Sequence, residues 1–303
     1  MTEQHHKKIF CPVCNSDDFK KIGTPVIDKK AAGYIRNEYT VVQCNSCNYY
    51  FVTPKIDFSQ DEWQKLYDDN YFPDMTSWHQ RQRLNDVKNR LDWINSNYNK
   101  EVKYFLDIGC GEGLALIEAD KREWSASGID ISDNRIEAAK NKKINFMNGN
   151  LLSANLPDEY FDCAYMDSIL EHLIEPVSYL NELNRILKKG GIVYIGVPNE
   201  DSLFNTIKRI VYNITGKKNI SEKIKPFALP YHIGGFNKKS IYRIAQSSNF
   251  KVAAINNFAA RFEFKKYKPL TKGFWLHLFL LPIDLLAIIL KREAYYEVLL
   301  MKL

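Results

Sequence analysis

The spacing of hydrophobic residues changes along the chain and divides it into three zones. The first zone ends near Pro54. In the second, Ser59 and Glu62 have the spacing of a capping box and predict a helix that runs through Leu66. A longer helix is predicted to follow, with apolar residues at helical spacing: Leu84, Val87, Leu91, Ile94 and Tyr98. From Tyr104 onward, runs of strand length alternate with segments of helical pattern.

The third zone predicts a parallel sheet covered by helices. Its strands are YFLDIG (104–109), SASGIDI (125–131), INFMNGN (144–150), FDCAYMD (161–167), GIVYIGVPN (191–199), 252–257 and 295–301. The predicted helices are 114–122, 132–140, 176–191, 238–248 and 274–290, with another helix and a loop within 201–235. This alternation is typical of an α/β fold, doubly wound and Rossmann-like, with a seven-stranded, mostly parallel sheet.

Basic residues are concentrated in the last third of the chain. The formal net charge is +6, but residues 201–303 hold 18 Lys and Arg against 6 Asp and Glu, whereas residues 56–200 hold 16 against 25. This excess favours a phosphate-bearing substrate or another anionic surface, and it is equally typical of a solvated lysine-rich face.

Neither end of the chain predicts a membrane span. The polar N-terminus carries no apolar signal region, so the cytoplasm is the expected compartment. Segment 274–290 is apolar but shorter than the roughly 20 residues needed to cross a bilayer, and His277, Pro282 and Asp284 interrupt it. We expect a packed or interfacial helix, which leaves room for peripheral contact with the inner face of the membrane.

Four of the six cysteines form two Cys-x-x-Cys pairs, Cys11 with Cys14 and Cys44 with Cys47. Two such knuckles can place four thiolates tetrahedrally around Zn²⁺, and the 29 residues between them suit a small hairpin ribbon. Four protein ligands leave no open position, so a structural zinc is expected. Buried or redox thiols are the alternative, although a redox pair would be expected beside a βαβ unit.

A glycine-rich turn follows the first strand of the third zone, in the sequence Leu106-Asp-Ile-Gly-Cys-Gly-Glu-Gly113. Glycines at this point let the backbone approach a ligand, at the edge of the sheet where such folds bind nucleotides. Asp130 ends the next strand and is placed to accept hydrogen bonds from ribose hydroxyls. The Gly-x-Gly-x-Gly spacing disfavours a dinucleotide-dependent dehydrogenase, which has Gly-x-Gly-x-x-Gly.

Asp-x-Gly-x-Gly-x-Gly followed by Gly-Ile-Asp-Ile-Ser resembles the binding fingerprint of class I S-adenosylmethionine methyltransferases. Residues 160–162, 169–172 and 187–191 fall where that family has its later motifs. The resemblance implies that Gly109 and Gly111 contact the methionyl part of the cofactor and that Asp130 holds its ribose. Asn150 stands where the family commonly has Asp, which accepts from the adenine amino group; an amide oxygen can also accept. The remaining residues implied to bind the cofactor are Asp107, Ile131 and Leu151.

The resemblance also organises the domains. We expect a zinc-ribbon module at 1–55, a helical linker that covers the cofactor at 56–100, and the methyltransferase domain at 101–303. Tyr67, Tyr71 and Trp78 are candidates for an aromatic cover, or for packing between ribbon and core. Methyltransferases with a similar ribbon often modify sugars or precursors of natural products and cell-surface glycans.

A hydroxyl acceptor must lose a proton during methyl transfer, and two histidines are candidates for the general base. His172 follows the fourth strand, and His232 lies in the Gly-flanked segment Tyr-His-Ile-Gly-Gly. Either histidine could equally be structural. The leading hypothesis is therefore O-methylation of a sugar hydroxyl on a phosphate-bearing precursor.

Three other functions stay open at this stage. An RNA or nucleobase methyltransferase also suits a zinc ribbon and a basic surface, although residues 1–55 hold only 8 basic against 5 acidic residues. A non-catalytic cofactor-binding scaffold at a membrane surface is another. C-methylation of a nucleotide sugar is the third, for which an additional C-terminal domain would be expected.

Overall fold

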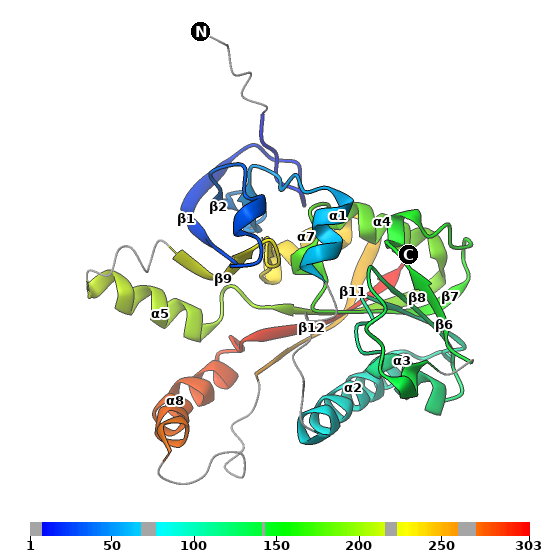
Figure 1. Cartoon of the computed structure of the whole chain (residues 1–303). Helices are drawn as coiled ribbons and strands as arrows, with labels where there is room; N and C mark the ends of the chain where they lie inside the picture. The colour runs from blue at the N-terminus through cyan, green and yellow to red at the C-terminus, as the bar shows by residue number, and fades with distance from the viewer. Residues whose placement is uncertain (1–7, 68–76, 141–142, 216–222, 260–270) are drawn as a thin grey trace.

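The computed structural model describes residues 8–67, 77–140, 143–215, 223–259 and 271–303. These residues form two β-sheets with helices around them (Figure 1). The larger sheet has seven strands in the order β11-β12-β8-β7-β4-β5-β6. The strands are β4 (Tyr104–Ile108), β5 (Ser125–Asp130), β6 (Asn145–Asn148), β7 (Phe161–Asp167), β8 (Leu187–Pro198), β11 (Phe250–Phe258) and β12 (Tyr295–Lys302).

Most neighbouring strands of the large sheet are parallel. β8, β7, β4, β5 and β6 pair in parallel, while β12 runs antiparallel to both β8 and β11. The carboxyl ends of β4, β5 and β7 therefore meet at one edge, where ligands bind in such folds. The prediction of a doubly wound, seven-stranded, mostly parallel sheet is confirmed.

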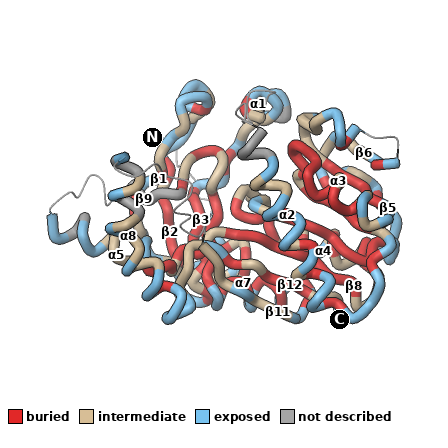
Figure 2. Tube along the Cα trace, turned by 90° about the horizontal axis from the view of Figure 1, so that it is seen from below, coloured by how far each residue is buried: buried red, intermediate tan, exposed pale blue. Residues whose placement is uncertain are grey.

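Helices cover both faces of the large sheet, as the two hydrophobic cores show. On one face, α2 (Ser77–Asn97) and α3 (Leu114–Lys121) bury their apolar residues against the strands. On the other, α4 (Pro176–Ile186) and α7 (Lys238–Ser247) do the same. Figure 2 shows buried residues along the strands and exposed residues on the outer sides of the helices.

The smaller sheet combines the N-terminal zone with two strands from the last third. Its order is β10-β3-β2-β1-β9, from β1 (Phe19–Ile27), β2 (Thr40–Cys44), β3 (Tyr50–Thr53), β9 (Lys223–Leu229) and β10 (Gly234–Gly235). A 3-10 helix, η1 (Ala32–Tyr34), lies between β1 and β2. The segment that contains His232 connects β9 to β10, so this sheet holds it at both ends.

The predicted helix over 132–140 is wrong. The described residues there form only the short 3-10 helix η2 (Glu137–Ala139). Local hydrogen bonds replace the helical ones, because the Asp130 side chain accepts from Ser132 N (3.2 Å) and the Asp133 side chain accepts from Arg135 N (3.4 Å). Ile136 N also donates to Glu112 O, which ties the segment to the glycine turn.

The helix predicted over 176–191 ends earlier, at Ile186. Leu187 is fully buried and pairs with Phe161, so the chain enters β8 at that point instead of continuing the helix. Gly190, expected at the helix end, lies within β8 with a positive φ of 74°. The capping box at Ser59 and Glu62 is confirmed at the start of α1 (Gln60–Leu66).

Two helices project from the large sheet near the end of β8 and the start of β12. α5 (Leu203–Ile214) lies in the segment where a helix and a loop were expected, and α8 (Lys272–Ile289) is the apolar helix. Arg292 joins them, since its guanidinium donates to Asp201 O (2.8 Å) and to Thr206 Oγ1 (2.7 Å). None of the helices in the described part of the chain is long and apolar enough to cross a membrane.

Candidate active site

The glycine turn lies between the end of β4 and the start of α3. Gly109 N donates to Ile129 O (2.8 Å), and Gly111 N donates to Asp130 Oδ2 (2.9 Å). Asp130 Oδ1 accepts from Ser132 N. The Asp130 carboxylate is therefore fixed beside the turn by backbone donors, and its predicted contact with the ribose stays a prediction.

Gly109 also sets the distance between this turn and the segment after β7. A Cβ built on Gly109 would overlap the Ile169 side chain, and the residue has a φ of 69°, which favours glycine. Ile169 directly precedes the 3-10 helix η4 (Leu170–His172). The glycine turn, called the cofactor turn below, is therefore in direct contact with the segment that leads to His172.

Three carboxylates meet at the carboxyl edge of β4, β5 and β7. Asp107 is 3% exposed, and burial together with nearby Asp130 and Asp167 raises its pKa well above the ordinary value. Burial likewise raises the pKa of Asp130, while its backbone hydrogen bonds oppose the shift. A cationic ligand would relieve this concentration of negative charge, and S-adenosylmethionine carries a sulfonium and an ammonium. The carboxyl groups at this edge therefore fit the positively charged part of that cofactor.

Sequence reasoning missed the ion pair of Asp167 and Arg90. Arg90 of α2 donates to Asp167 Oδ2 at 2.6 Å and lies 3.7 Å from Glu297 of β12. Asp167 could have been found as the acid that ends the strand FDCAYMD, but nothing in the sequence marks Arg90 as its partner. This pair neutralises one of the three carboxylates and leaves Asp107 and Asp130 for a ligand.

The residues implied to contact adenine and ribose follow the carboxyl ends of β5 and β6. Ile131 follows β5 and is partly exposed, whereas Leu151 is buried at the start of η3 (Leu151–Ser153). Asn150 Oδ1 already accepts from Leu152 N at 2.9 Å, as the N-cap of that 3-10 helix. A carbonyl oxygen has two lone pairs, so one remains for the predicted adenine contact.

Tyr67, in the linker, contacts both the segment that follows β5 and the segment that contains His232. Its carbonyl accepts from Ser132 Oγ (2.9 Å), and its ring packs edge-on against Tyr231 with centroids 5.3 Å apart. Arg83 of α2 forms an ion pair with Glu112 in the glycine turn. Of the other candidates for an aromatic cover, Tyr71 and the side chain of Trp78 lie outside the described residues.

His172 and His232, proposed as alternative bases, come together in space. Their rings are edge-on with centroids 4.7 Å apart, and Glu171 Oε1 lies 3.9 Å from His172 Nε2. Burial, and the neighbouring His232, lower the pKa of His172 to about 3; burial also lowers the pKa of His232. Both imidazoles are therefore neutral at pH 7. Glu171, which sequence reasoning noted only as a neighbour of His172, completes the cluster.

The four cysteines of the ribbon also converge. All four sulfur atoms lie within 4.8 Å of one another, with Cys11 and Cys47 at 3.6 Å and Cys14 and Cys44 at 3.5 Å. The two knuckles have the same turn, because Asn15 N donates to Cys11 O and Asn48 N donates to Cys44 O, each at 2.9 Å. Sulfurs bound to one Zn²⁺ at about 2.3 Å are about 3.8 Å apart, so the arrangement fits zinc.

The ribbon packs directly on the candidate site. Tyr49, two residues after Cys47, is 1% exposed and stacks on Phe51 of β3. Gly234 pairs with Phe51, and Ile233 N donates to Glu171 O at 3.0 Å. The hydrogen bonds that place His232 beside Glu171 therefore depend on the sheet that carries the cysteines.

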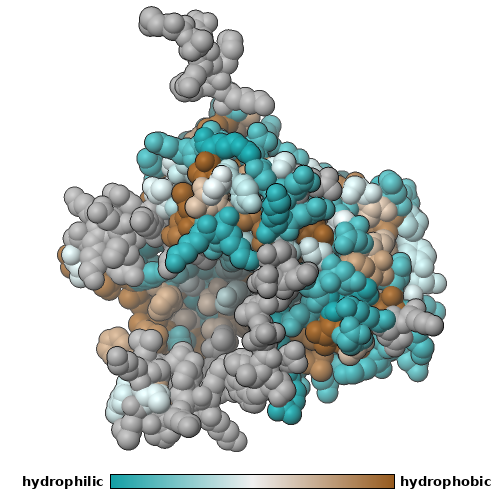
Figure 3. Space-filling view, in the orientation of Figure 1, coloured by the Kyte–Doolittle hydropathy of each residue, from teal (hydrophilic) through white to brown (hydrophobic). Residues whose placement is uncertain are grey.

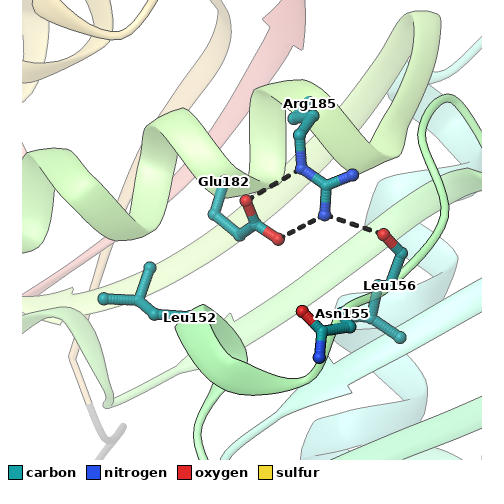
Figure 4. A pocket seen from close by; sticks show the side chains of 5 residues that line it. All are labelled: Leu152, Asn155, Leu156, Glu182 and Arg185. Atoms are coloured by element: carbon teal, nitrogen blue, oxygen red, sulfur yellow. Dashed lines mark hydrogen bonds and ion pairs between the residues drawn. The ribbon is translucent and has the colours of Figure 1, made fainter.

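A separate surface pocket lies between η3 and α4 (Figure 4). It is lined by Leu152, Asn155, Leu156, Glu182 and Arg185. The Arg185 guanidinium is already engaged by Glu182 (2.6 Å) and Leu156 O (2.7 Å). None of the predicted cofactor residues lines this pocket, so we assign it no role in the chemistry.

Comparison with known proteins identifies the family of the chain. A methyltransferase domain family model matches residues 77–255, more than half of the chain. The ubiquinone biosynthesis O-methyltransferase of Dechloromonas aromatica is 26% identical over 196 residues, which are 62% of this chain and 78% of that enzyme. An uncharacterized 37.1 kDa protein in transposon TN4556 of Streptomyces fradiae is 27% identical over 158 residues; the match covers 50% of this chain and only 44% of that protein.

Solved structures agree on the fold. A chain in the complex between the Haloferax volcanii Trm112 methyltransferase activator and the putative methyltransferase matches with a TM-score of 0.50 and 14% identity, over 72% of this chain and 92% of that one. At this identity the likeness concerns the fold alone. The family match and the shared fold agree: the chain belongs to the methyltransferase domain family, and the glycine turn and carboxylates of its candidate site fit S-adenosylmethionine as the methyl donor.

Proposed function

We propose that the chain methylates a hydroxyl oxygen of a sugar, in a glycan or natural-product precursor that carries phosphate. The observation that carries this proposal is the cluster of Glu171, His172 and His232, which lies next to the cofactor turn through the contact between Ile169 and Gly109. Relatives named ubiquinone biosynthesis O-methyltransferase support an oxygen acceptor. The ribbon and the basic last third support a sugar phosphate.

The residues of the chain would act mainly by positioning. S-adenosylmethionine supplies a methyl group that its sulfonium has already activated. Asp130 would hold the ribose, and Asp107 would face the positive end of the methionyl part. What the protein must add is an acceptor oxygen in line with the methyl group and a path for its proton, and the proposal places both at the Glu171–His172–His232 cluster.

The test is methyl transfer from labelled S-adenosylmethionine to defined nucleotide sugars, lipid-linked sugars and RNA. Label in a sugar fraction, lost in His172→Ala and His232→Ala at unchanged cofactor affinity, would support the proposal. Full turnover of an identified hydroxyl acceptor by both variants would remove the histidines from the chemistry. Label in RNA, with binding that weakens steeply as salt rises, would replace the sugar with a nucleic acid.

We also propose that the four cysteines hold a structural Zn²⁺. Their convergence and the matched knuckles support it. The cysteine sulfurs of Cys11, Cys44 and Cys47 are buried, and four thiolates leave no position for a substrate. One zinc per chain by metal analysis, absent from Cys44→Ser, is the expected result.

A third proposal concerns location: α5 and α8 rest on an anionic membrane surface. Both helices expose large apolar side chains, namely Phe204, Ile210, Val211, Ile214, Trp275, Phe279, Leu285, Leu286, Ile288 and Ile289. Figure 3 shows hydrophobic side chains gathered where these helices lie. The basic excess of residues 201–303 complements anionic lipid.

Flotation with vesicles tests this location. Binding to vesicles containing phosphatidylglycerol, but not to pure phosphatidylcholine, is expected for the native chain, with loss in Phe279→Glu. Leu152→Glu is the matched control, because Leu152 is also exposed but lies away from α5 and α8, at η3. Equal flotation of Phe279→Glu and the native chain would contradict the proposed surface.

A further inference from the structure

The Glu171–His172–His232 cluster has three polar atoms that nothing in the described structure satisfies. Glu171 Oε2, His172 Nδ1 and His232 Nδ1 are buried and lack a hydrogen-bond partner among the described residues. Glu171 is 2% exposed. Buried polar groups in native proteins are almost always paired. Three atoms without a hydrogen bond, from three adjoining side chains, therefore indicate a missing partner that can accept the lone pairs of these atoms.

The chemistry of the three groups selects a cation. Two imidazoles and the carboxyl group of Glu171 can each supply a lone pair to a cation, and one ligand atom from each lies within 4.8 Å of the others. Around a divalent ion with bonds of about 2.1 Å, neighbouring ligand atoms are about 3 Å apart, so rotations of these side chains would close the site.

We infer that Glu171, His172 and His232 bind a divalent metal ion, on which the acceptor hydroxyl is deprotonated. Two imidazoles and one carboxylate leave coordination positions open, as a catalytic metal site requires. This ion is distinct from the ribbon zinc, whose thiolate ligands are all supplied by residues 11–47. The inference rests on the proposed hydroxyl methylation for its chemistry, but not for metal binding.

The step balances without an oxidant or reductant. The acceptor hydroxyl binds the ion, which lowers the pKa of the hydroxyl, and its proton passes to water. The oxygen then forms a bond with the methyl carbon as the carbon–sulfur bond breaks, and the electron pair stays on sulfur, which becomes a neutral thioether. The location suits this step, because Ile169 joins η4 to the cofactor turn at Gly109.

Manganese binding tests the inference separately from activity. Mn²⁺ suits nitrogen and oxygen ligands and competes poorly with zinc for thiolates. We would titrate the zinc-loaded full-length chain with Mn²⁺ and follow the free ion by electron paramagnetic resonance. One bound Mn²⁺ per chain is expected, with affinity reduced about tenfold or more in Glu171→Gln and His232→Ala.

Glu200→Gln is the matched control. Glu200 is also a buried acid whose Oε2 lacks a hydrogen bond, with Arg209 3.8 Å away, and it lies outside the cluster, so this variant should weaken Mn²⁺ binding far less than Glu171→Gln does. Unchanged S-adenosylmethionine affinity would show that the cluster variants are folded. Failure of the native chain to bind Mn²⁺, or equal binding by Glu171→Gln, would overturn the inference.

Activity separates the two proposals. If Mn²⁺ binds as expected but no hydroxyl acceptor is methylated with the ion present, the metal site stands and the proposed function fails. If a hydroxyl acceptor is methylated at full rate by chain that holds no ion at the cluster, the proposed function stands and the metal site is not catalytic, which overturns the inference.

Discussion

The variant Gly109→Ala tests whether packing between the cofactor turn and Ile169 also positions the histidine cluster. Gly109 has a φ of 69°, and a Cβ there would overlap Ile169 Cδ1 and lie 2.8 Å from Cγ1. The left-handed backbone costs about 1–2 kcal/mol for a non-glycine residue. Displacing a packed side chain adds about 1–3 kcal/mol. We therefore expect Gly109→Ala to lower the free energy of unfolding by about 2–5 kcal/mol.

Two further variants divide that loss into its parts. Gly149→Ala has strain without overlap, because Gly149 also has a positive φ but no atom within 4 Å of the added Cβ. Ile169→Ala in the Gly109→Ala background removes the overlapping atoms and should recover the packing part. Unlike Gly149→Ala, Gly109→Ala should also slow methyl transfer, because a displaced Ile169 moves the start of η4.

Urea unfolding of these three variants, of Ile169→Ala alone and of the native chain, with calorimetric titration of S-adenosylmethionine, measures these effects. The reasoning is refuted if Gly109→Ala is as stable as the native chain. It is equally refuted if Ile169→Ala lowers the stability of the Gly109→Ala chain by as much as it lowers that of the native chain, since the two positions would then be independent.

Three other predictions concern the cofactor, the ribbon and a buried acid. Asp130→Ala should weaken S-adenosylmethionine binding about tenfold or more, because it removes a charged acceptor; equal calorimetric affinity would contradict the ribose assignment. Cys44→Ser should raise hydrogen exchange in residues 229–235, which pair with the ribbon sheet, and unchanged exchange there would separate ribbon from site. Glu200→Gln should stabilise the chain by about 3 kcal/mol above pH 7 and have little effect at pH 4, measured by urea unfolding; a pH-independent effect would be inconsistent with its ionisation.

The sign of the last prediction follows from burial. Burial raises the pKa of Glu200 to about 7, with Arg209 opposing the shift. An unfolded glutamate ionises near pH 4.5, so the folded state is penalised progressively as pH rises from there to about 7, and by a constant amount above it. Glutamine cannot ionise, so its advantage appears over the same interval.

Local patterns in the sequence determined the sheet, the glycine turn and the ribbon. Each depends on neighbours within a few residues: strand-length apolar runs, three glycines and an acid at a strand end, and two Cys-x-x-Cys pairs. The same local reasoning failed over 132–140, because Ile136 N donates to Glu112 O, a contact made by the glycine turn from 24 positions away. It failed again at Leu187, whose burial beside β7 ends the preceding helix.

Only the tertiary structure decided which polar residues act together. His172 and His232 are 60 positions apart and were proposed as alternatives, yet β9 and β10 join the N-terminal sheet and bring their rings to 4.7 Å. The partnership of Arg90 with Asp167 has the same origin. Spacing along a chain reports periodicity within one helix or strand, whereas the meeting of two segments depends on how separate elements pack. The sequence thus determined the elements and the cofactor turn, and packing determined the site in which an acceptor would react.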